Sequence, residues 1–186
     1  SVSKDASEGI SQASLVYSDE KLAERVAFIH ERVGTAAIAE QYIDGRELYV
    51  GVLGNTQLRV FPVWELEFGE GRDIPKIAPR KVKHDTDYQE RRGILQGPAE
   101  NLSPETVARI QTSAKRICRT LELDGYARID FRLAADGTPY FLEANPNPEI
   151  ARNEEYASAA DYAGLGYPAL LDRILALARN RASPSA

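Results

Sequence analysis

Two alternating segments of the chain, 126–133 and 138–144, flank the dipeptide Asp136-Gly137. Alternation on both sides of an Asp-Gly pair is typical of a β-hairpin with a two-residue turn. The turn fixes which residues face each other, and side chains alternate between the two faces. The pairs expected on one face are Asp130 with Glu143 and Arg128 with Asn145. The sequence therefore predicts a hairpin with one strongly charged face.

The other face of this hairpin is apolar apart from one phenol. Its expected pairs are Ile129 with Ala144, Phe131 with Leu142, and Leu133 with Tyr140. We therefore expect this face to pack against the rest of the protein.

The facing carboxylates of Asp130 and Glu143 repel each other, so a stable fold needs a compensating positive charge. Together with Asn145, these residues supply the hard oxygen ligands that Mg²⁺ prefers, and Mg²⁺ takes few protein ligands. Alternatively, Arg128 neutralises part of the charge in a solvated salt bridge, which contributes about 0 to 1 kcal/mol. The pattern alone leaves both interpretations open.

Outside the hairpin, residue spacing predicts both helices and strands. Gly34 is a natural end for the first helix, and Ser103 and Pro104 are a typical helix start. The predicted helices are 18–33, one that begins after Ser103, 155–163 and 168–180. The predicted strands are 37–43, 47–53 and 58–68, followed by a long loop over 69–101. The expected fold class is α+β.

The run Arg128-Ile-Asp130, followed by Glu143-Ala-Asn145 and a proline, resembles the metal-binding hairpin of ATP-grasp enzymes, in particular D-alanine:D-alanine ligases. The resemblance implies an ATP-grasp carboxy-terminal domain, with an antiparallel sheet flanked by helices. It also implies that Asp130, Glu143 and Asn145 bind two Mg²⁺ ions, or Mn²⁺, at the phosphates of ATP. Arg128 would then stabilise an acyl-phosphate intermediate, because metals and a guanidinium neutralise charge during phosphoryl transfer.

A second segment, 39–48, resembles the hinge of the same family. The resemblance implies that Glu40 accepts a hydrogen bond from the adenine amino group and that Glu47 accepts from the ribose hydroxyls. The backbone groups expected at the adenine ring are those of Gln41, Tyr42 and Ile43. Read without the family, the same acids indicate a polar strand edge.

Two further segments agree with this resemblance. Residues 5–11 are similar to a small-residue loop that covers the phosphates with backbone N–H groups, and its expected phosphate ligands are Ser7, Glu8 and Gly9. Lys83 lies where the family places a lysine over the active site, with Lys81 as the other candidate. Without the family, the first segment indicates an ordinary turn and the second a solvated basic patch.

The composition excludes other classes of function. The net charge is -5 and the pI is about 5.2, so there is no broad basic field for nucleic acid or an anionic membrane. The single cysteine, Cys118, excludes an internal disulfide, and no stretch approaches the roughly 20 apolar residues of a membrane span. We expect a cytoplasmic protein whose partners are ATP and small carboxylate and amine substrates, and we leave the oligomeric state open, with a homodimer among the options.

The expected activity is ATP- and Mg²⁺-dependent joining of a carboxylate to an amine. The resemblance covers residues 1–186 as one ATP-grasp domain without the amino-terminal substrate domain and the first half of the central domain, so this part alone should be inactive. Glu149 and Glu154 stand where D-alanine ligases have a glycine and a serine, so D-alanyl-D-alanine is a doubtful product. The alternatives are a non-catalytic nucleotide-binding module and a structural domain with a charged hairpin.

Overall fold

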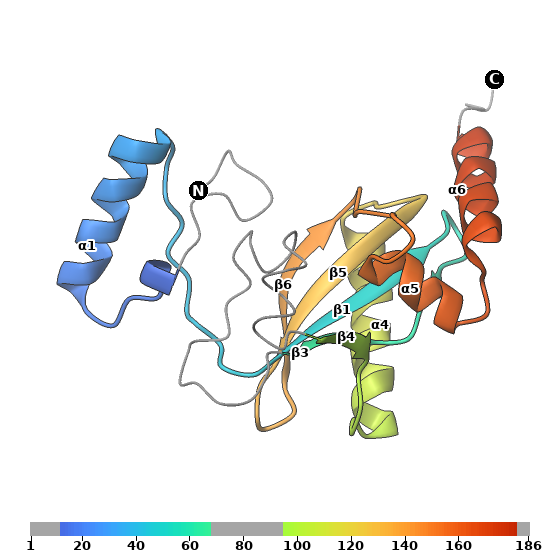
Figure 1. Cartoon of the computed structure of the whole chain (residues 1–186), viewed down its shortest axis with the longest axis horizontal. Helices are drawn as coiled ribbons and strands as arrows, with labels where there is room; N and C mark the ends of the chain where they lie inside the picture. Colours follow the sequence, from blue (N-terminus) through green and yellow to red (C-terminus); the bar gives the residue numbers. More distant parts are fainter. Residues whose placement is uncertain (1–11, 68–94, 182–186) are drawn as a thin grey trace. The chain divides into compact units, whose positions relative to one another are not determined.

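The computed structural model of the chain describes residues 12–67 and 95–181. The chain divides into two compact units, and each has its own architecture. Among the described residues, the first unit contains 12–43 and Leu95, and the second contains 44–67 and 96–181. Figure 1 shows the helices and strands in their order along the chain.

The first unit contains the amino-terminal helix. Its elements are η1 (Gln12–Ser14), α1 (Asp19–Phe28) and a π-helical continuation, η2 (Ile29–Val33). Ser18 caps α1, because its hydroxyl accepts a hydrogen bond from the Lys21 backbone N–H at 3.3 Å. Gly34 ends the helix in the left-handed conformation with a φ of 74°. The prediction of a helix over 18–33 that ends at Gly34 is confirmed.

Residues 37–43 form no strand, so that prediction was wrong. A strand needs a neighbouring backbone to complete its hydrogen bonds, and this segment has no ladder partner among the described residues. Ile38 in this segment is 61% exposed, so the alternating pattern does not produce a buried face either. Strand propensity without a pairing partner is therefore not sufficient here.

The second unit is built on a six-stranded sheet. Its strands are β1 (Arg46–Leu53), β2 (Arg59–Val60), β3 (Trp64–Glu67), β4 (Leu95–Pro98), β5 (Tyr126–Leu133) and β6 (Pro139–Asn145). The order across the sheet is β4-β3-β1-β5-β6, and β2 pairs with β1. β1 is antiparallel to β2, β3 and β5, and β5 is antiparallel to β6. The α+β fold class with an antiparallel sheet is confirmed.

Two predictions about the middle of the chain were wrong in detail. The strand expected over 58–68 is divided into β2 and β3, because its register against β1 shifts by one residue between the pairs Val52–Val60 and Tyr49–Trp64. The loop expected over 69–101 contains β4, while the rest of that range up to residue 94 lies outside the described residues. The sequence of β4, Leu-Gln-Gly-Pro, has no strand pattern of its own and becomes a strand by pairing with β3.

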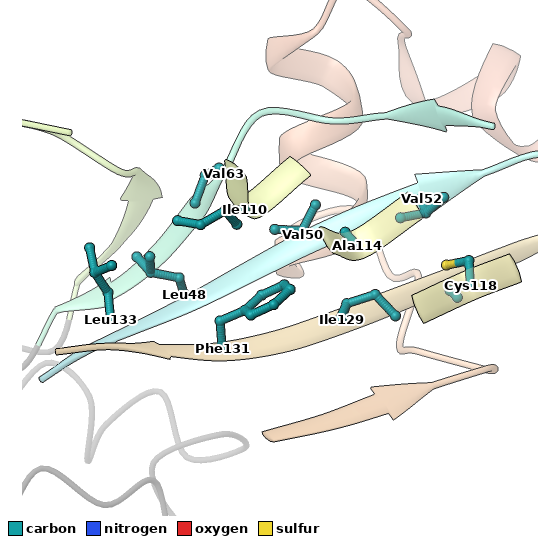
Figure 2. Packing of buried hydrophobic residues seen from close by; sticks show 11 residues of the cluster. Leu48, Val50, Val52, Val63, Ile110, Ala114, Cys118, Ile129, Phe131 and Leu133 are labelled. Carbon is teal, nitrogen blue, oxygen red and sulfur yellow. The ribbon is translucent and has the colours of Figure 1, made fainter. Parts of the chain in front are cut away.

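One face of the sheet packs against α4 (Pro104–Thr120), and their contact forms the main core. Ser103 Oγ accepts a hydrogen bond from Thr106 N–H at 3.1 Å, as the predicted helix start requires. Figure 2 shows the core side chains from α4 and the strands. They are Leu48, Val50, Val52, Val63, Ile110, Ala114, Cys118, Ala127, Ile129, Phe131 and Leu133. Each large side chain buried in this way contributes about 1.5 to 3 kcal/mol.

The opposite face of the sheet packs against α5 (Glu155–Tyr162), which is followed by α6 (Tyr167–Arg181). Tyr156 of α5 donates from its hydroxyl to Val52 O at 3.0 Å, and its ring lies edge-on to Phe61 with centroids 5.3 Å apart. A Cβ at Gly51 would lie 2.7 Å from a Phe61 ring carbon, so this packing requires glycine. Both helices agree with the predicted ranges to within one residue.

The turn of the β5–β6 hairpin differs from the prediction by one position. The Ala134 carbonyl accepts from Gly137 N–H at 2.9 Å, and Ala134 N–H donates to Thr138 O at 3.0 Å. Gly137 has a φ of 80°, so a turn centred on Ala135-Asp136 is followed by a left-handed glycine. The expected two-residue turn centred on Asp136-Gly137 was therefore wrong.

A second irregularity restores the predicted register at the charged pairs. The ladder shifts between Asp130 and Phe131, so that Leu142 becomes the extra residue of a bulge in β6. The confirmed pairs are Asp130 with Glu143, Arg128 with Asn145, and Ile129 with Ala144. The pairs predicted beyond the bulge were wrong, because Phe131 faces Phe141 and Leu133 faces Pro139.

Candidate functional site

A cluster of buried charged side chains lies on the face of the sheet opposite α4. Its members come from β1, β5 and the first residue of α5, and they are Glu47, Arg128, Asp130, Arg132 and Glu155. None is more than 7% exposed. Burial of a charged group is costly unless the group is paired and hydrogen-bonded. The contacts within this buried charged cluster therefore determine what it can do.

Arg128 is the centre of the cluster. Its Nε and Nη2 donate to the two oxygens of Asp130 at 2.8 and 2.9 Å, and its Nη1 lies 3.5 Å from Glu155 Oε2. Burial by itself lowers the pKa of Arg128, but the hydrogen bonds and charge of Asp130, with the charge of Glu155, raise it above its ordinary value. Arg128 is therefore a fixed positive charge on this face.

Glu47 is held by two donors on the same face. Tyr49 Oη donates to Glu47 Oε1 at 2.7 Å, and Arg132 Nη2 donates to Glu47 Oε2 at 3.0 Å. Glu47 lies directly opposite Arg132 in the ladder, and Tyr49 is two residues from Glu47 on the same face of β1. The pairing of β1 with β5 therefore brings the predicted ribose ligand into the same cluster as Arg128.

The predicted metal ligands lie on neighbouring positions of the hairpin. Asp130 faces Glu143 across the ladder, and Asn145 faces Arg128. Asp130 is buried, Glu143 is exposed, and Asn145 is half-buried with its Oδ1 accepting from Asn147 N–H at 3.0 Å. Within residues 12–67 and 95–181, no group of three His, Cys, Asp or Glu residues is placed to hold a metal ion. Two carboxylates and one amide oxygen nevertheless match the hard donor set of Mg²⁺, which completes its coordination with water and phosphate oxygens.

The remaining predicted site residues fall into two groups. Glu40, Gln41 and Tyr42 are exposed and Ile43 is half-buried, and all four belong to the first unit, whereas Glu47 belongs to the second. The other group lies outside the described residues and consists of Ser7, Glu8, Gly9, Lys81 and Lys83.

The sequence analysis missed three members of this site, namely Tyr49, Arg132 and Glu155. Arg132 is two residues beyond Asp130, so strand alternation could have placed it on the charged face. Tyr49 and Glu155 lie outside the hairpin, and only the pairing of β1 with β5 and the packing of α5 bring them there.

The segment after the hairpin adds more acidic groups. Glu149 Oε1 accepts from the backbone N–H groups of Ile150 and Ala151, both at 3.1 Å, and Glu154 is the N-cap residue of α5. Burial, followed by the negative charges of Glu155 and Glu149, raises the pKa of Glu154 above its ordinary value of 4.5. This end of the cluster therefore disfavours a further negative charge.

Comparison with known proteins gives the family of the chain. The family model described as the D-ala D-ala ligase C-terminus matches residues 2–176. This chain belongs to that family. It is thus the carboxy-terminal, ATP-grasp portion of a D-alanine ligase-like protein.

Two curated proteins are similar to this chain over most of its length. An uncharacterised protein of Sinorhizobium fredii is 32% identical over 90% of this chain and 48% of its own length. The D-alanine–D-alanine ligase of Desulfotalea psychrophila is 30% identical over 88% of this chain and 48% of its own length. The chain therefore spans about half the length of these relatives.

A solved structure supports the same fold. The D-alanine–D-alanine ligase from Bacillus anthracis, complexed with ATP, has a TM-score of 0.70 over 89% of this chain and 48% of that chain, with 21% identity. At this identity the likeness concerns the fold alone. In the described residues, 12–67 and 95–181, no helix is both long and apolar enough to cross a bilayer.

Proposed function

We propose that this chain is the ATP- and metal-binding part of a ligase that joins a carboxylate to an amine. The observation that carries the proposal is the register of the hairpin, which places Asp130 opposite Glu143 with Arg128 on the same face. The membership of the D-ala D-ala ligase C-terminus family supports it. Residues 1–186 would act as a single ATP-grasp domain of the longer enzyme.

The proposed reaction has two steps. The γ-phosphoryl group of ATP passes to an oxygen of the substrate carboxylate, and ADP leaves. The amine then attacks the carbonyl carbon of the acyl phosphate, phosphate leaves, and the amine nitrogen loses a proton. Both steps move negative charge, so the site must supply positive charge in fixed positions.

Asp130, Glu143 and Asn145 would hold the metal, as two Mg²⁺ ions or Mn²⁺. When bound, the metal would neutralise charge on the phosphate oxygens. Arg128 would stabilise the transferring phosphoryl group, because its raised pKa keeps the guanidinium charged and Asp130 fixes its orientation. Lys83 is the proposed second cation.

The proposed nucleoside ligands lie between Glu40 and Glu47 in the sequence. Glu40 would accept from the adenine amino group and Glu47 from the ribose hydroxyls. The backbone groups of Gln41, Tyr42 and Ile43 would contact the adenine ring. The proposed phosphate loop consists of Ser7, Glu8 and Gly9.

The amine substrate is proposed to differ from D-alanine. Glu149 and Glu154 supply negative charge close to the hairpin, and like charges at short distance repel. A substrate carboxylate would be disfavoured there. We therefore propose an ATP-driven ligation whose product is not D-alanyl-D-alanine.

The test is phosphate release by the full-length protein with ATP, Mg²⁺ and a panel of amino acids. We expect amino-acid-dependent release that falls at least about 100-fold in Glu143→Gln, since removal of a metal ligand weakens both binding and charge neutralisation. Glu122→Gln is the matched control, because Glu122 is exposed and follows α4.

Three results would contradict parts of the proposal. Equal release by Glu143→Gln and the wild type would remove the metal assignment. Binding of Mg-ATP without substrate-dependent ADP release would identify a non-catalytic nucleotide-binding module. Absence of Mg-ATP binding by the full-length protein would leave a structural domain with a charged hairpin.

A further inference from the structure

Glu47 uses both oxygens of its carboxylate in contacts with the sheet, one donor to each oxygen. Tyr49 Oη donates to Oε1 at 2.7 Å, and Arg132 Nη2 donates to Oε2 at 3.0 Å. An ionised carboxylate has about four acceptor positions, two on each oxygen. With respect to donors in residues 12–67 and 95–181, each oxygen of Glu47 therefore keeps one acceptor position, and the two positions together match the two donors of a pair of neighbouring hydroxyl groups.

The ring of Tyr49 contacts the other functional group of the cluster. The guanidinium carbon of Arg128 lies 4.8 Å from the centroid of the Tyr49 ring. A guanidinium over an aromatic face is attracted by the negative charge density of that face. Tyr49 is only 1% exposed, so both its hydroxyl and its ring are held in place by surrounding protein. One buried side chain therefore touches both Glu47 and Arg128.

We propose that Tyr49 is a positioning residue whose hydroxyl orients Glu47 toward the ribose hydroxyls of ATP and whose ring fixes the guanidinium of Arg128. This inference rests on the proposed function, because it assumes that Glu47 and Arg128 act on ATP. It adds the prediction that Glu47 and Tyr49 together recognise the ribose diol, while Arg128 and Tyr49 together act on the transferring phosphoryl group.

The protonation state of Tyr49 suits this role. Burial, followed by the negative charges of Glu47 and Asp130, raises the pKa of the phenol well above 10. The hydroxyl therefore keeps its proton at neutral pH and remains a donor to Glu47. A second buried tyrosine, Tyr156, donates instead to the backbone oxygen of Val52 at 3.0 Å, and it provides a matched comparison on the same face of the sheet.

The test compares full-length wild type with Tyr49→Phe, Tyr49→Leu and Tyr156→Phe. Each enzyme is assayed for phosphate release with ATP and with 2′,3′-dideoxy-ATP, which lacks both ribose hydroxyls. Tyr49→Phe keeps the ring and loses the hydroxyl, so we expect its KM for ATP to rise about 5- to 20-fold while kcat changes less than about 2-fold. With dideoxy-ATP, Tyr49→Phe and the wild type should have equal KM values. Tyr49→Leu should in addition lower kcat, because the ring over Arg128 is lost.

A purely structural role for Tyr49 makes a different prediction. Tyr49→Phe would then change the KM of ATP and the KM of dideoxy-ATP by the same factor, as we expect for Tyr156→Phe, and this result would overturn the inference while leaving the proposed function intact. An unchanged KM for ATP in Tyr49→Phe would also overturn it. Thermal unfolding of each variant verifies that it is folded.

Nucleotide binding by calorimetry gives the same comparison if the wild type releases no phosphate. In that case the ratio of dissociation constants for ATP and dideoxy-ATP replaces the ratio of KM values. A wild type that binds ATP and dideoxy-ATP with equal affinity would show that Glu47 does not recognise the ribose. That outcome would contradict the inference independently of catalysis.

Discussion

Arg128 shows how single residues in this protein combine structural and chemical roles. Its guanidinium contacts the carboxylates of Asp130 and Glu155 and the ring of Tyr49. Removal of one partner from such a buried network costs about 3 to 5 kcal/mol, because the remaining charge is left without compensation. The same contacts that stabilise the fold therefore hold the proposed catalytic cation in a single orientation.

Glu154 gives a prediction about pH at the residue scale. Because burial and the charges of Glu155 and Glu149 raise its pKa in the folded state above 4.5, the folded state binds more protons than the unfolded state just above that pH. Its ionisation therefore lowers stability as the pH rises through the folded-state pKa. We expect Glu154→Gln to have a higher Tm than the wild type at pH 7, and the difference to disappear below about pH 4.

Thermal unfolding over this pH range measures the effect of Glu154→Gln. Glu105→Gln is the control, because Glu105 is exposed in the first turn of α4. A lower Tm for Glu154→Gln at pH 7 would show that the Glu154 carboxylate is stabilised where it lies, against our assignment of the charges around it.

At the scale of elements, the β5–β6 hairpin places the charged pairs through two compensating irregularities. The turn is one position earlier than the expected Asp-Gly turn, and the bulge at Leu142 restores the register before Glu143. The sequence analysis therefore predicted the facing pairs Asp130–Glu143 and Arg128–Asn145 correctly, although it placed the turn wrongly. A register read from turn residues alone is therefore reliable only when bulges are absent.

The contact between β1 and α5 gives a prediction about packing. A methyl group at Gly51 would lie 2.7 Å from a Phe61 ring carbon and 3.1 Å from the Tyr156 ring. We expect Gly51→Ala to destabilise the protein by about 1 to 3 kcal/mol, because the rings must move to accommodate it. Chemical denaturation measures this difference.

Gly97→Ala in β4 is the matched control for this packing prediction. A methyl group at Gly97 meets no atom within 4 Å among the described residues. Its effect on the free energy of unfolding should stay within about 0.5 kcal/mol. Equal destabilisation by Gly51→Ala and Gly97→Ala would show that the cost arises from strand propensity rather than from the rings of Phe61 and Tyr156.

For the whole molecule, we expect the binding of Mg-ATP to increase the stability of the folded state. A ligand that binds only the folded protein stabilises it by about 2.7 kcal/mol at 100 times its Kd. We therefore expect Mg-ATP to raise the Tm of the full-length protein by several degrees, and EDTA to abolish that increase. Asp130→Asn should show little or no increase with Mg-ATP.

If ATP raised the Tm as much in EDTA as it does in Mg²⁺, the metal assignment for Asp130 and Glu143 would be contradicted. Arg46→Lys provides a control for loss of a charged contact elsewhere in the sheet. Arg46 Nε donates to Glu65 of β3 at 2.7 Å, and this contact includes none of the proposed metal ligands, so its variant should keep the Mg-ATP effect.

The sequence by itself determined the helices of this protein and the residue types of the candidate site. Helix periodicity with Ser18, Ser103 and Gly34 as boundary residues is a local property, because capping and backbone conformation depend on a few neighbours. The facing of Asp130 and Glu143 is nearly local, since one hairpin contains both residues.

Only the tertiary structure decided which strands pair, and hence which side chains meet. The pairing of β1 with β5 puts Glu47 opposite Arg132 and Tyr49 opposite Asp130, although some 80 residues separate the partners along the chain. β4 is a strand only through its place beside β3, while residues 37–43 have strand propensity and no partner among the described residues. Pairing between distant segments depends on how the whole core packs, and that information is not contained in any local pattern.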